Sequence, residues 1–399
     1  MTDPGRAGPG PERGGDDPAD ETIAAEPGSE VSGPKNPARP GPDTSARISA
    51  MKRAIGDAER VIVLTHDNPD PDAIASSAGL GFLLGKATGL PVTLAFGGIV
   101  GRAENRALLE ELGVTFEKAE SLEFSPSAAV ALVDTQPRAG NNSLPAGKIA
   151  TIVIDHHPVR PESSAAPYSD VRPEYGACAS MIVEFLRASK LEPDRQLATA
   201  LFYAIQSETM DLGREASQAE LDASLFLYPR SDPAALSRIR HARVPRAVYR
   251  SIHAGLEKAW SRGGVVCVPA GRLDYPDIVA QLADLFLRVD DVDWVIAAGR
   301  YRDGLYLSLR TLNPNAHAGD LVRRVVGARG SAGGHGEMAG ARLDVSRLSA
   351  EEYRDLETSL LDEFCAELGV ADEPRIPLVP PQTGETPATS ESADGKPDE

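Results

Sequence analysis

The sequence has little of several features that would place it in a familiar class. Only three cysteines are spread over 399 residues, which argues against a disulfide framework or a cysteine-based metal site and favours a reducing compartment. No stretch approaches the roughly 20 apolar residues of a membrane span, and no apolar segment of a secretory signal follows Met1. We therefore expect a cytoplasmic protein that makes no membrane contact.

Positive charge and aromatic side chains are also scarce. The formal net charge is −18, and aromatic residues make up 5% of the chain. Proteins that hold long nucleic acids use a basic surface, and single strands stack on aromatic platforms. We therefore expect any nucleotide to bind in a local pocket and expect no long duplex as a partner.

Composition divides the chain into five parts. Both ends are rich in Pro, Gly, Ser, Asp and Glu, so they cannot bury enough apolar surface to offset the entropy of ordering. This composition predicts disordered tails at 1–45 and 371–399. Between them we predict a larger domain at 46–230, a helical linker at 231–262, and a smaller domain with a closing helix at 263–370.

Buried apolar runs alternate with amphipathic segments through both predicted domains. The expected strands lie at 61–65, 91–96, 128–133 and 150–154, and then at 265–268, 294–299 and 305–309. Helices are expected between them and at 349–368. This alternation predicts a doubly wound, mostly parallel α/β sheet followed by a smaller α/β domain, with a cleft between the two.

Acidic and imidazole side chains follow the predicted strands of the larger domain. They are His66, Asp70 and Asp72 after the first strand, Asp134 after the third, and Asp155, His156 and His157 after the fourth. Because the carboxyl ends of parallel strands share one edge of the sheet, these groups can converge there. For the first group, an Asp-rich turn that only caps a helix is the alternative.

Such a set of side chains suits divalent metal ions. Nitrogen and oxygen ligands without a thiolate favour Mn²⁺ or Mg²⁺, with Co²⁺ or Zn²⁺ as alternatives. Two ions about 3.5–4 Å apart, bridged by a carboxylate and a water, are the usual machinery of phosphoester hydrolysis. The adjacent pair His156–His157, directly after a buried strand and an aspartate, is harder to explain as an ordinary core or surface pair.

The order of these motifs resembles the DHH phosphoesterase superfamily. His66-x-x-Pro69-Asp70-x-Asp72-Ala73 comes first, and Asp134 and Asp155-His156-His157 follow in turn. The later stretch 333–340, GGHGEMAG, is similar to the GGH signature of the DHHA1 domain that follows DHH in this family. The resemblance covers about 46–345 and implies a DHH domain joined to a DHHA1 substrate-binding domain.

Roles for individual residues follow from this resemblance. It implies two Mn²⁺ ions, with Mg²⁺ or Co²⁺ as alternatives, a bridging Asp134, and His157 and Asp155 as further catalytic residues. The implied metal ligands are His66, Asp70, Asp72, Asp134, His156 and Glu208. The fourth motif reads Ser207-Glu208-Thr209 where the family has an aspartate, so Asp211 is the alternative ligand.

The resemblance also implies a substrate site in the smaller domain, formed by Arg310, Gly333, Gly334 and His335. Arg310 would fork onto a phosphate, and the glycines would let backbone N–H groups approach phosphate oxygens. A tight turn is the alternative explanation of the glycine pair.

The implied activity is that of a metal-dependent phosphoesterase of the nano-RNase and pAp-phosphatase branch, related to RecJ. Such an enzyme acts as an oligoribonuclease, a dinucleotide phosphodiesterase or a 3′-phosphatase of adenosine 3′,5′-bisphosphate (pAp). A RecJ-like single-strand exonuclease and a non-catalytic nucleotide-binding regulatory module are the alternatives. The expected partner is a short oligonucleotide or nucleotide, and a homodimer is left open.

Overall fold

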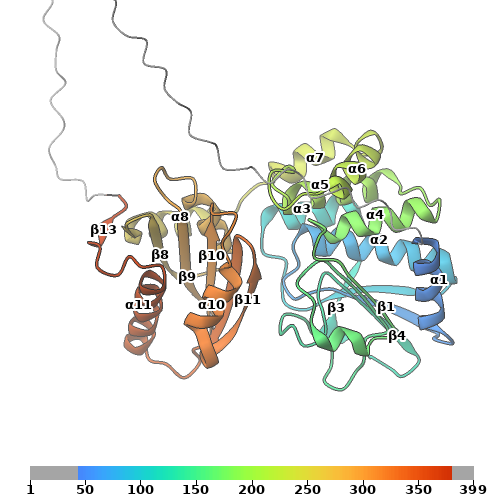
Figure 1. Ribbon diagram of the computed structural model, residues 1–399, viewed down its shortest axis with the longest axis horizontal. Helices are drawn as coiled ribbons and strands as arrows, with labels where there is room; N and C mark the ends of the chain where they lie inside the picture. Colours follow the sequence, from blue (N-terminus) through green and yellow to red (C-terminus); the bar gives the residue numbers. More distant parts are fainter. Residues whose placement is uncertain (1–43, 380–399) are drawn as a thin grey trace, which may run out of the picture.

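The computed structural model describes residues 44–379, which form two α/β domains (Figure 1). The predicted tails lie mostly in residues 1–43 and 380–399, outside the described part of the chain. The fold class is confirmed: a mostly parallel sheet with helices is followed by a second, mixed sheet with its own helices. Within 44–379, no helix is long and apolar enough to cross a membrane.

The first domain is built on six parallel strands in the order β3-β2-β1-β4-β5-β6. The strands are β1 (Arg60–Leu64), β2 (Val92–Phe96), β3 (Phe116–Lys118), β4 (Ala128–Val133), β5 (Ile152–Asp155) and β6 (Tyr168–Val171). Every residue of β4 is buried, as expected for a strand covered on both faces of a parallel sheet. The sequence analysis missed β3 and β6, which are short and partly polar, FEK and YSDV.

The strand order reverses between β1 and β4. The chain runs outward from β1 to β3 and then returns to place β4 against the other side of β1, with Val61 paired to Ala129. The connections that leave the carboxyl ends of β1 and β4 therefore diverge. Open α/β sheets bind their ligands at such a switch point.

Helices cover one face of this sheet, as Figure 1 shows for α2, α4 and α5. They are α1 (Thr44–Ile55), α2 (Pro71–Thr88), α3 (Ala103–Leu112), α4 (Cys178–Ala188), α5 (Arg195–Glu208), α6 (Gln218–Leu227) and α7 (Pro233–Arg240). The central helix α2 begins with Pro71 after an Asp70 cap and ends at Gly89, whose φ is 73°, so both ends carry strong boundary signals. Apolar side chains from connecting segments, including Leu122, Phe124 and Leu144, pack on the other face.

The second domain is a seven-stranded sheet in the order β11-β12-β10-β9-β8-β7-β13, in which β8 and β9 are parallel and the other neighbours antiparallel. The strands are β7 (Trp260–Arg262), β8 (Val265–Arg272), β9 (Trp294–Tyr301), β10 (Gly304–Thr311), β11 (Gly330–His335), β12 (Met338–Asp344) and β13 (Ile376–Pro377). Helices α8 (Arg246–Lys258) and α9 (Ile278–Phe286) pack on one face, and α10 (Ala318–Val326) and α11 (Ala350–Glu367) on the other. Short 3-10 turns are η1 (Ala119–Ser121), η2 (Pro161–Ala165), η3 (Tyr228–Arg230) and η4 (Gly327–Arg329).

The structure departs from two of the sequence-based boundaries. Helix α7 buries Leu236 and Ile239 in the first core, whereas α8 buries Val248 in the second. The helices of the predicted linker therefore belong one to each domain, and the chain crosses between domains at 241–245. The tail predicted to start at 371 is also too long, because Ile376–Pro377 pairs with β7 at the edge of the second sheet.

Candidate metal centre

The loop after β1 brings His66 to the switch point. Its Nδ1 lies 3.0 Å from the carbonyl oxygen of Asp67, so this nitrogen carries the proton and donates it to the backbone. The other ring nitrogen, Nε2, faces Asp70 Oδ2 at 3.6 Å and Asp134 Oδ2 at 3.5 Å. Metal-binding histidines are oriented by this kind of hydrogen bond from the second nitrogen.

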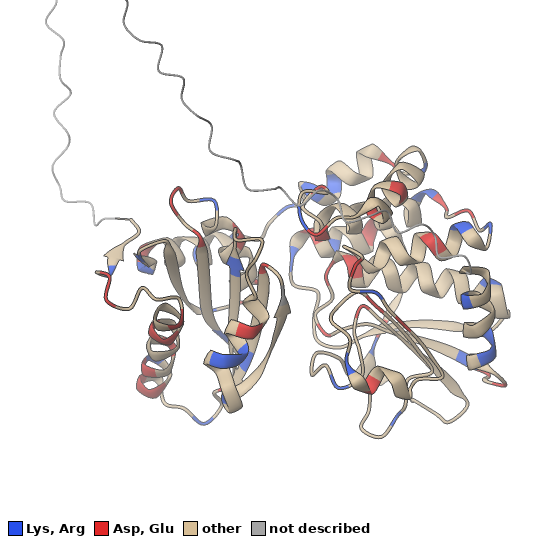
Figure 2. Cartoon of the chain, viewed as in Figure 1, with Lys and Arg blue, Asp and Glu red and all other residues tan. Residues whose placement is uncertain are grey.

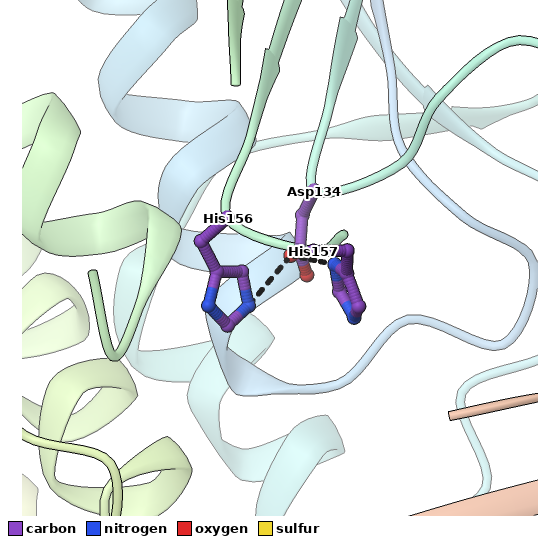
Figure 3. A group of neighbouring side chains, drawn as sticks. All are labelled: Asp134, His156 and His157. Atoms are coloured by element: carbon purple, nitrogen blue, oxygen red, sulfur yellow. Dashed lines mark ion pairs between the residues drawn. The ribbon is translucent and has the colours of Figure 1, made fainter. Parts of the chain in front are cut away.

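Asp134 lies at the centre of the cluster, directly after β4. Its φ is 58°, an uncommon value for a residue with a side chain. The carboxylate is buried, and its Oδ1 accepts no hydrogen bond although it is shielded from water. Figure 3 shows the rings of His156 and His157 on either side of it, with Nε2 of His156 at 3.5 Å and Nδ1 of His157 at 3.7 Å from Oδ1. A buried carboxylate oxygen without a donor is costly, which makes it a good position for a cation.

The two histidines after β5 are held in different ways. His156 is buried and its Nδ1 lies 3.2 Å from the Tyr175 carbonyl oxygen, so its Nε2 faces Asp134 and, at 3.8 Å, Asp72. His157 contacts Asp155 through Nδ1 at 2.8 Å and keeps 36% of its side chain exposed. The buried ring is thus placed to bind inward, and the exposed ring is placed to meet an incoming molecule.

Asp155 is fixed by a buried glutamine that the sequence analysis missed. Gln136 Nε2 donates to Asp155 Oδ2 at 2.6 Å, and Gln136 Oε1 accepts from the Arg160 N–H and the Ser163 hydroxyl, both at 2.8 Å. The backbone N–H of His156 donates to Asp155 Oδ1 at 2.9 Å. The only sequence signal for Gln136 is its place two residues after Asp134, which does not separate it from an ordinary loop residue.

Asp72 has both of its carboxylate oxygens engaged at the start of α4. Oδ2 accepts from the N–H of Cys178 at 2.7 Å, and Oδ1 accepts from the N–H of Ala179 at 2.8 Å and from Ser76 Oγ at 3.1 Å. The helix dipole favours a negative charge at this end. Asp72 therefore ties α2 to α4 while it faces the cluster.

The buried charges act strongly on one another. Burial and the nearby Asp134 carboxylate raise the pKa of Asp72 well above its usual range. Burial alone would also raise the pKa of Asp134, but its contacts with His156 and His66 outweigh burial and hold that pKa below its usual range. Two carboxylates this close resist being charged together unless a cation lies between them.

Among residues 44–379, three groups of ligand atoms lie close enough to share an ion, each with all its atoms within 4.8 Å of one another. They are His66, Asp70 and Asp134; Asp134, His156 and His157; and Asp72, Asp134 and Cys178. Asp134 belongs to all three. The Cys178 thiol is buried and contacts the Ile154 carbonyl oxygen at 3.7 Å. This contact is typical of a cysteine that packs in a protein core. The structure thus brings together His66, Asp70, Asp72, Asp134 and His156, while their function as ligands stays a prediction.

The two candidate carboxylates of the fourth motif, Glu208 and Asp211, lie in different surroundings. Asp211 pairs with Arg240 at 3.1 Å and has a 68% exposed side chain. Glu208, the last residue of α5, belongs to none of the three groups, but burial and the Asp70 carboxylate raise its pKa. Of the two, Glu208 is thus the carboxylate whose pKa responds to the charge of Asp70, and Asp211 is engaged with Arg240.

The predicted substrate residues of the second domain differ in their contacts and packing. Arg310 Nε donates to Asp284 at 2.7 Å. The glycine pair lies in strand β11, so the tight-turn alternative at this position is wrong. A side chain on Gly334, whose φ is 148°, would overlap the backbone of Met338, whereas Gly333 meets nothing within 4 Å. Gly334 is thus required for packing. For His335, only the backbone of β11 is described.

Comparisons with known proteins give one family match and one relative. Residues 60–205 match the family model described as "DHH family, N-terminal domain". An uncharacterized protein of Methanocaldococcus jannaschii is 30% identical over 305 residues, which are 76% of this chain and 62% of that protein. This chain therefore spans less than two thirds of the length of that relative.

One solved structure shares the architecture at low sequence identity. An exopolyphosphatase-related protein from Bacteroides fragilis matches with a TM-score of 0.64 at 14% identity, covering 82% of this chain and 98% of its own. The shared fold therefore extends over both domains. RecJ from Thermus thermophilus, in complex with Mg²⁺, matches with a TM-score of 0.39 at 12% identity, covering 83% of this chain and 52% of its own.

Proposed function

We propose that this chain is a phosphoester hydrolase that depends on divalent metal ions, because residues 60–205 match the family model described as "DHH family, N-terminal domain". One observation carries the proposal. Five imidazole and carboxylate side chains that follow β1 and β5 converge on Asp134, which follows β4 and whose buried Oδ1 accepts no hydrogen bond. This is the donor set and the shared carboxylate that a pair of hard divalent ions requires.

We propose that the metal ligands form two sets, one for each ion, and that Asp134 is shared by both sets. We assign His66 and Asp70 to one ion and Asp72 and His156 to the other, with Mn²⁺ as the proposed metal. A divalent pair held by these residues would supply activation of a water and neutralisation of charge on phosphoryl oxygens. His66 and His156 each donate Nδ1–H to a backbone carbonyl, which keeps their Nε2 atoms facing the carboxylates.

His157 and Asp155 act on the substrate side. The contact between His157 Nδ1 and Asp155 fixes the orientation of the half-exposed ring, and we propose that the ring contacts the phosphate under attack. Asp155 stays in place because Gln136 and the His156 backbone N–H both donate to it.

The distribution of charge over the two domains favours short substrates over long nucleic acids. We propose that the protein hydrolyses short oligonucleotides, linear dinucleotides or the bisphosphate pAp, with the second domain holding the far end of the substrate. Basic residues are interspersed with acidic ones on both domains (Figure 2). A processive exonuclease would instead need a continuous basic track with aromatic platforms.

A panel of substrates tests this function. Purified protein is incubated with Mn²⁺ and a dinucleotide, a 5-mer, a 24-mer, pAp or pyrophosphate, and the products are separated. We expect mononucleotide from the dinucleotide and the 5-mer or phosphate from pAp, and loss of activity with a chelator. Preferred degradation of the 24-mer would favour a RecJ-like exonuclease, and binding without turnover would favour a regulatory module.

Replacing Gln136 by Ala should lower Mn²⁺ affinity or turnover by about 10-fold. Loss of a residue that holds the groups around a metal by hydrogen bonds typically lowers metal affinity or activity by about 10–100-fold. The change removes a donor to Asp155 and leaves its orientation less defined. The measurement is kcat on a dinucleotide at saturating and limiting Mn²⁺. Gln206→Ala, which loses a surface contact with Arg240, is the matched control, and equal activity of both variants would remove Gln136 from the site.

A further inference from the structure

Two of the three cysteines meet in the core of the second domain. Cys267 lies on β8 and Cys365 on α11, and their Sγ atoms are 3.8 Å apart although the residues are separated by 98 positions in the sequence. Both side chains are fully buried. The third cysteine, Cys178, lies in the first domain at the start of α4. The contact between the two thiols is therefore set by the packing of α11 on the second sheet.

Regular secondary structure holds both thiols in place. Strand β8 pairs with β7 through Trp260, opposite Cys267, and with β9 through Ile296, so Cys267 belongs to an interior strand. Cys365 and Leu361 of α11 belong to the same apolar cluster as Cys267. A disulfide requires its two sulfurs about 2.0 Å apart, so the two thiols need only a small approach to be joined.

A metal ion is a poor explanation of this pair. None of the three close groups of potential ligand atoms found among residues 44–379 includes Cys267 or Cys365. Zinc that is held by thiolates usually has four protein ligands, whereas this pair offers two sulfurs. The covalent reaction that is open to two adjacent thiols is the formation of a disulfide.

Nearby charges make Cys365 the more acidic thiol. Arg262 and Arg375 both pair with Asp362, at 3.2 and 2.9 Å, three residues before Cys365 on α11. The contact with Cys267, together with the charge of Arg262, outweighs burial and holds the pKa of Cys365 below its usual range. Burial and the neighbouring Cys365 raise the pKa of Cys267. Because the thiolate is the nucleophilic form of cysteine, we expect Cys365 to react first.

A cavity of about 280 Å³ lies next to the pair, and its lining includes Pro269, Leu361 and Arg375. The side chain of Arg375 is 40% exposed, so the cavity is open to solvent. Pro269 lies two residues from Cys267 and therefore on the same face of β8, and Leu361 lies one turn before Cys365 on α11. The two thiols thus lie directly behind the wall of a cavity that a small oxidant can enter.

We propose that Cys267 and Cys365 form a reversible disulfide when the protein meets a peroxide. The Cys365 thiolate attacks one peroxide oxygen, the O–O bond breaks, and the hydroxide that leaves takes up the proton that Cys365 had released. Cys365 then carries a sulfenic acid. The Cys267 sulfur attacks the Cys365 sulfur, and the sulfenic OH group leaves with the Cys267 proton as water. Two thiols and one peroxide thus give one disulfide and two waters, and the two sulfurs supply the two electrons.

The disulfide would tie α11 to an interior strand of the second sheet. It closes a long loop, because the cysteines are 98 positions apart, and such a cross-link strongly restricts the unfolded chain. Figure 1 shows α11 at the end of the second domain that is remote from the first domain. The modification therefore acts on the stability of the second domain and is independent of the proposed function. In a reducing compartment a disulfide of this kind is transient.

The test is a peptide map of the native, unmodified protein after treatment with hydrogen peroxide. A dithiol peptide in the same sample shows when oxidation is complete, the remaining thiols are alkylated in denaturant, and the protein is digested without reductant. We expect a linked peptide pair that contains Cys267 and Cys365, with Cys178 alkylated, and three alkylated cysteines after dithiothreitol. Three alkylated cysteines after peroxide, or Cys365 converted to a sulfinic acid without a link, would overturn the proposal.

Thermal unfolding followed by tryptophan fluorescence measures the consequence. Trp260 and Trp294 are the two tryptophans of the chain, and both lie in the second domain. The disulfide should raise the unfolding midpoint by about 10 °C, as expected for the closure of a long loop, and dithiothreitol should reverse the shift. A linked protein with an unchanged or lower midpoint would contradict the stabilising effect.

Matched variants separate the pair from general oxidation. Cys365→Ser removes the thiol that reacts first, and Cys178→Ser is the same change at a buried cysteine outside the pair. The first variant should show neither link nor shift, and the second should keep both. If Cys365→Ser does not fold, Cys267→Ser takes its place, and the map of the unmodified protein decides without either variant. A link that forms only in denaturant, or one that includes Cys178, would reject the native pair.

Discussion

Asp134→Asn is expected to lower Mn²⁺-dependent hydrolysis of a dinucleotide by about 10⁴-fold, the scale of removing a central catalytic group. Asparagine has nearly the same shape as aspartate and tolerates a positive φ better than most residues, so the backbone at φ 58° is retained. The amide cannot supply the negative charge that His66 and His156 face from opposite sides. Both proposed ions should therefore bind more weakly.

The measurements are turnover on the dinucleotide and bound manganese per chain after equilibrium dialysis. Asp211→Asn is the matched control, because it is the same chemical change at a carboxylate that pairs with Arg240. It should keep normal activity and metal content. Turnover of Asp134→Asn within about 10-fold of the unmodified protein, at matched Mn²⁺, would exclude Asp134 as the bridge.

Gly334→Ala is expected to destabilise the second domain by about 4 kcal/mol, from the combined cost of an unfavourable backbone conformation and overpacking. The added methyl group would overlap the Met338 carbonyl and Ala339, and the backbone φ of 148° suits only glycine. The neighbouring helix adds to the restriction, because Gly319 of α10 packs directly on the Gly334 carbonyl. Chemical unfolding followed by tryptophan fluorescence measures the effect.

Gly333→Ala is the matched control one residue away. Gly333 faces open space and has no positive φ, so the change should alter stability by less than about 1 kcal/mol. If Gly333→Ala folds normally but loses activity, the backbone of β11 approaches the substrate at that position. If Gly334→Ala is as stable as the unmodified protein, the packing explanation for this motif fails.

The residues around Asp134 could be found from sequence because they follow a simple rule. His66, Asp134 and His156 each come within two residues of the end of a buried apolar strand, and parallel strands place those ends along one edge. Apolar strands are recognisable from short windows of sequence. Local pattern and general topology together were therefore enough to predict that these side chains converge.

Other parts of the site depend on contacts that no local pattern contains. Gln136 is identified only by its hydrogen bond to Asp155, 19 positions away. Outside the site, Cys267 and Cys365 meet only because α11 packs on the second sheet, 98 positions apart. Helix α6 was missed although its Ser217 and Glu220 form a capping box. Strand β11 was also missed, because its glycines lack the side chains of typical strands.

The two-residue strand β13 covers the edge strand β7 of the second sheet and so limits its pairing with other molecules. It pairs with β7, and Leu378 N–H donates to the Ala259 carbonyl at 2.9 Å, so the backbone groups along that side of β7 are engaged within the chain. An uncovered strand edge is a template for pairing with another copy, whereas an edge that ends in proline offers fewer N–H donors. Trimming the chain before Ile376 would expose β7, and concentrated solutions of such a shortened protein would be prone to edge-to-edge aggregation.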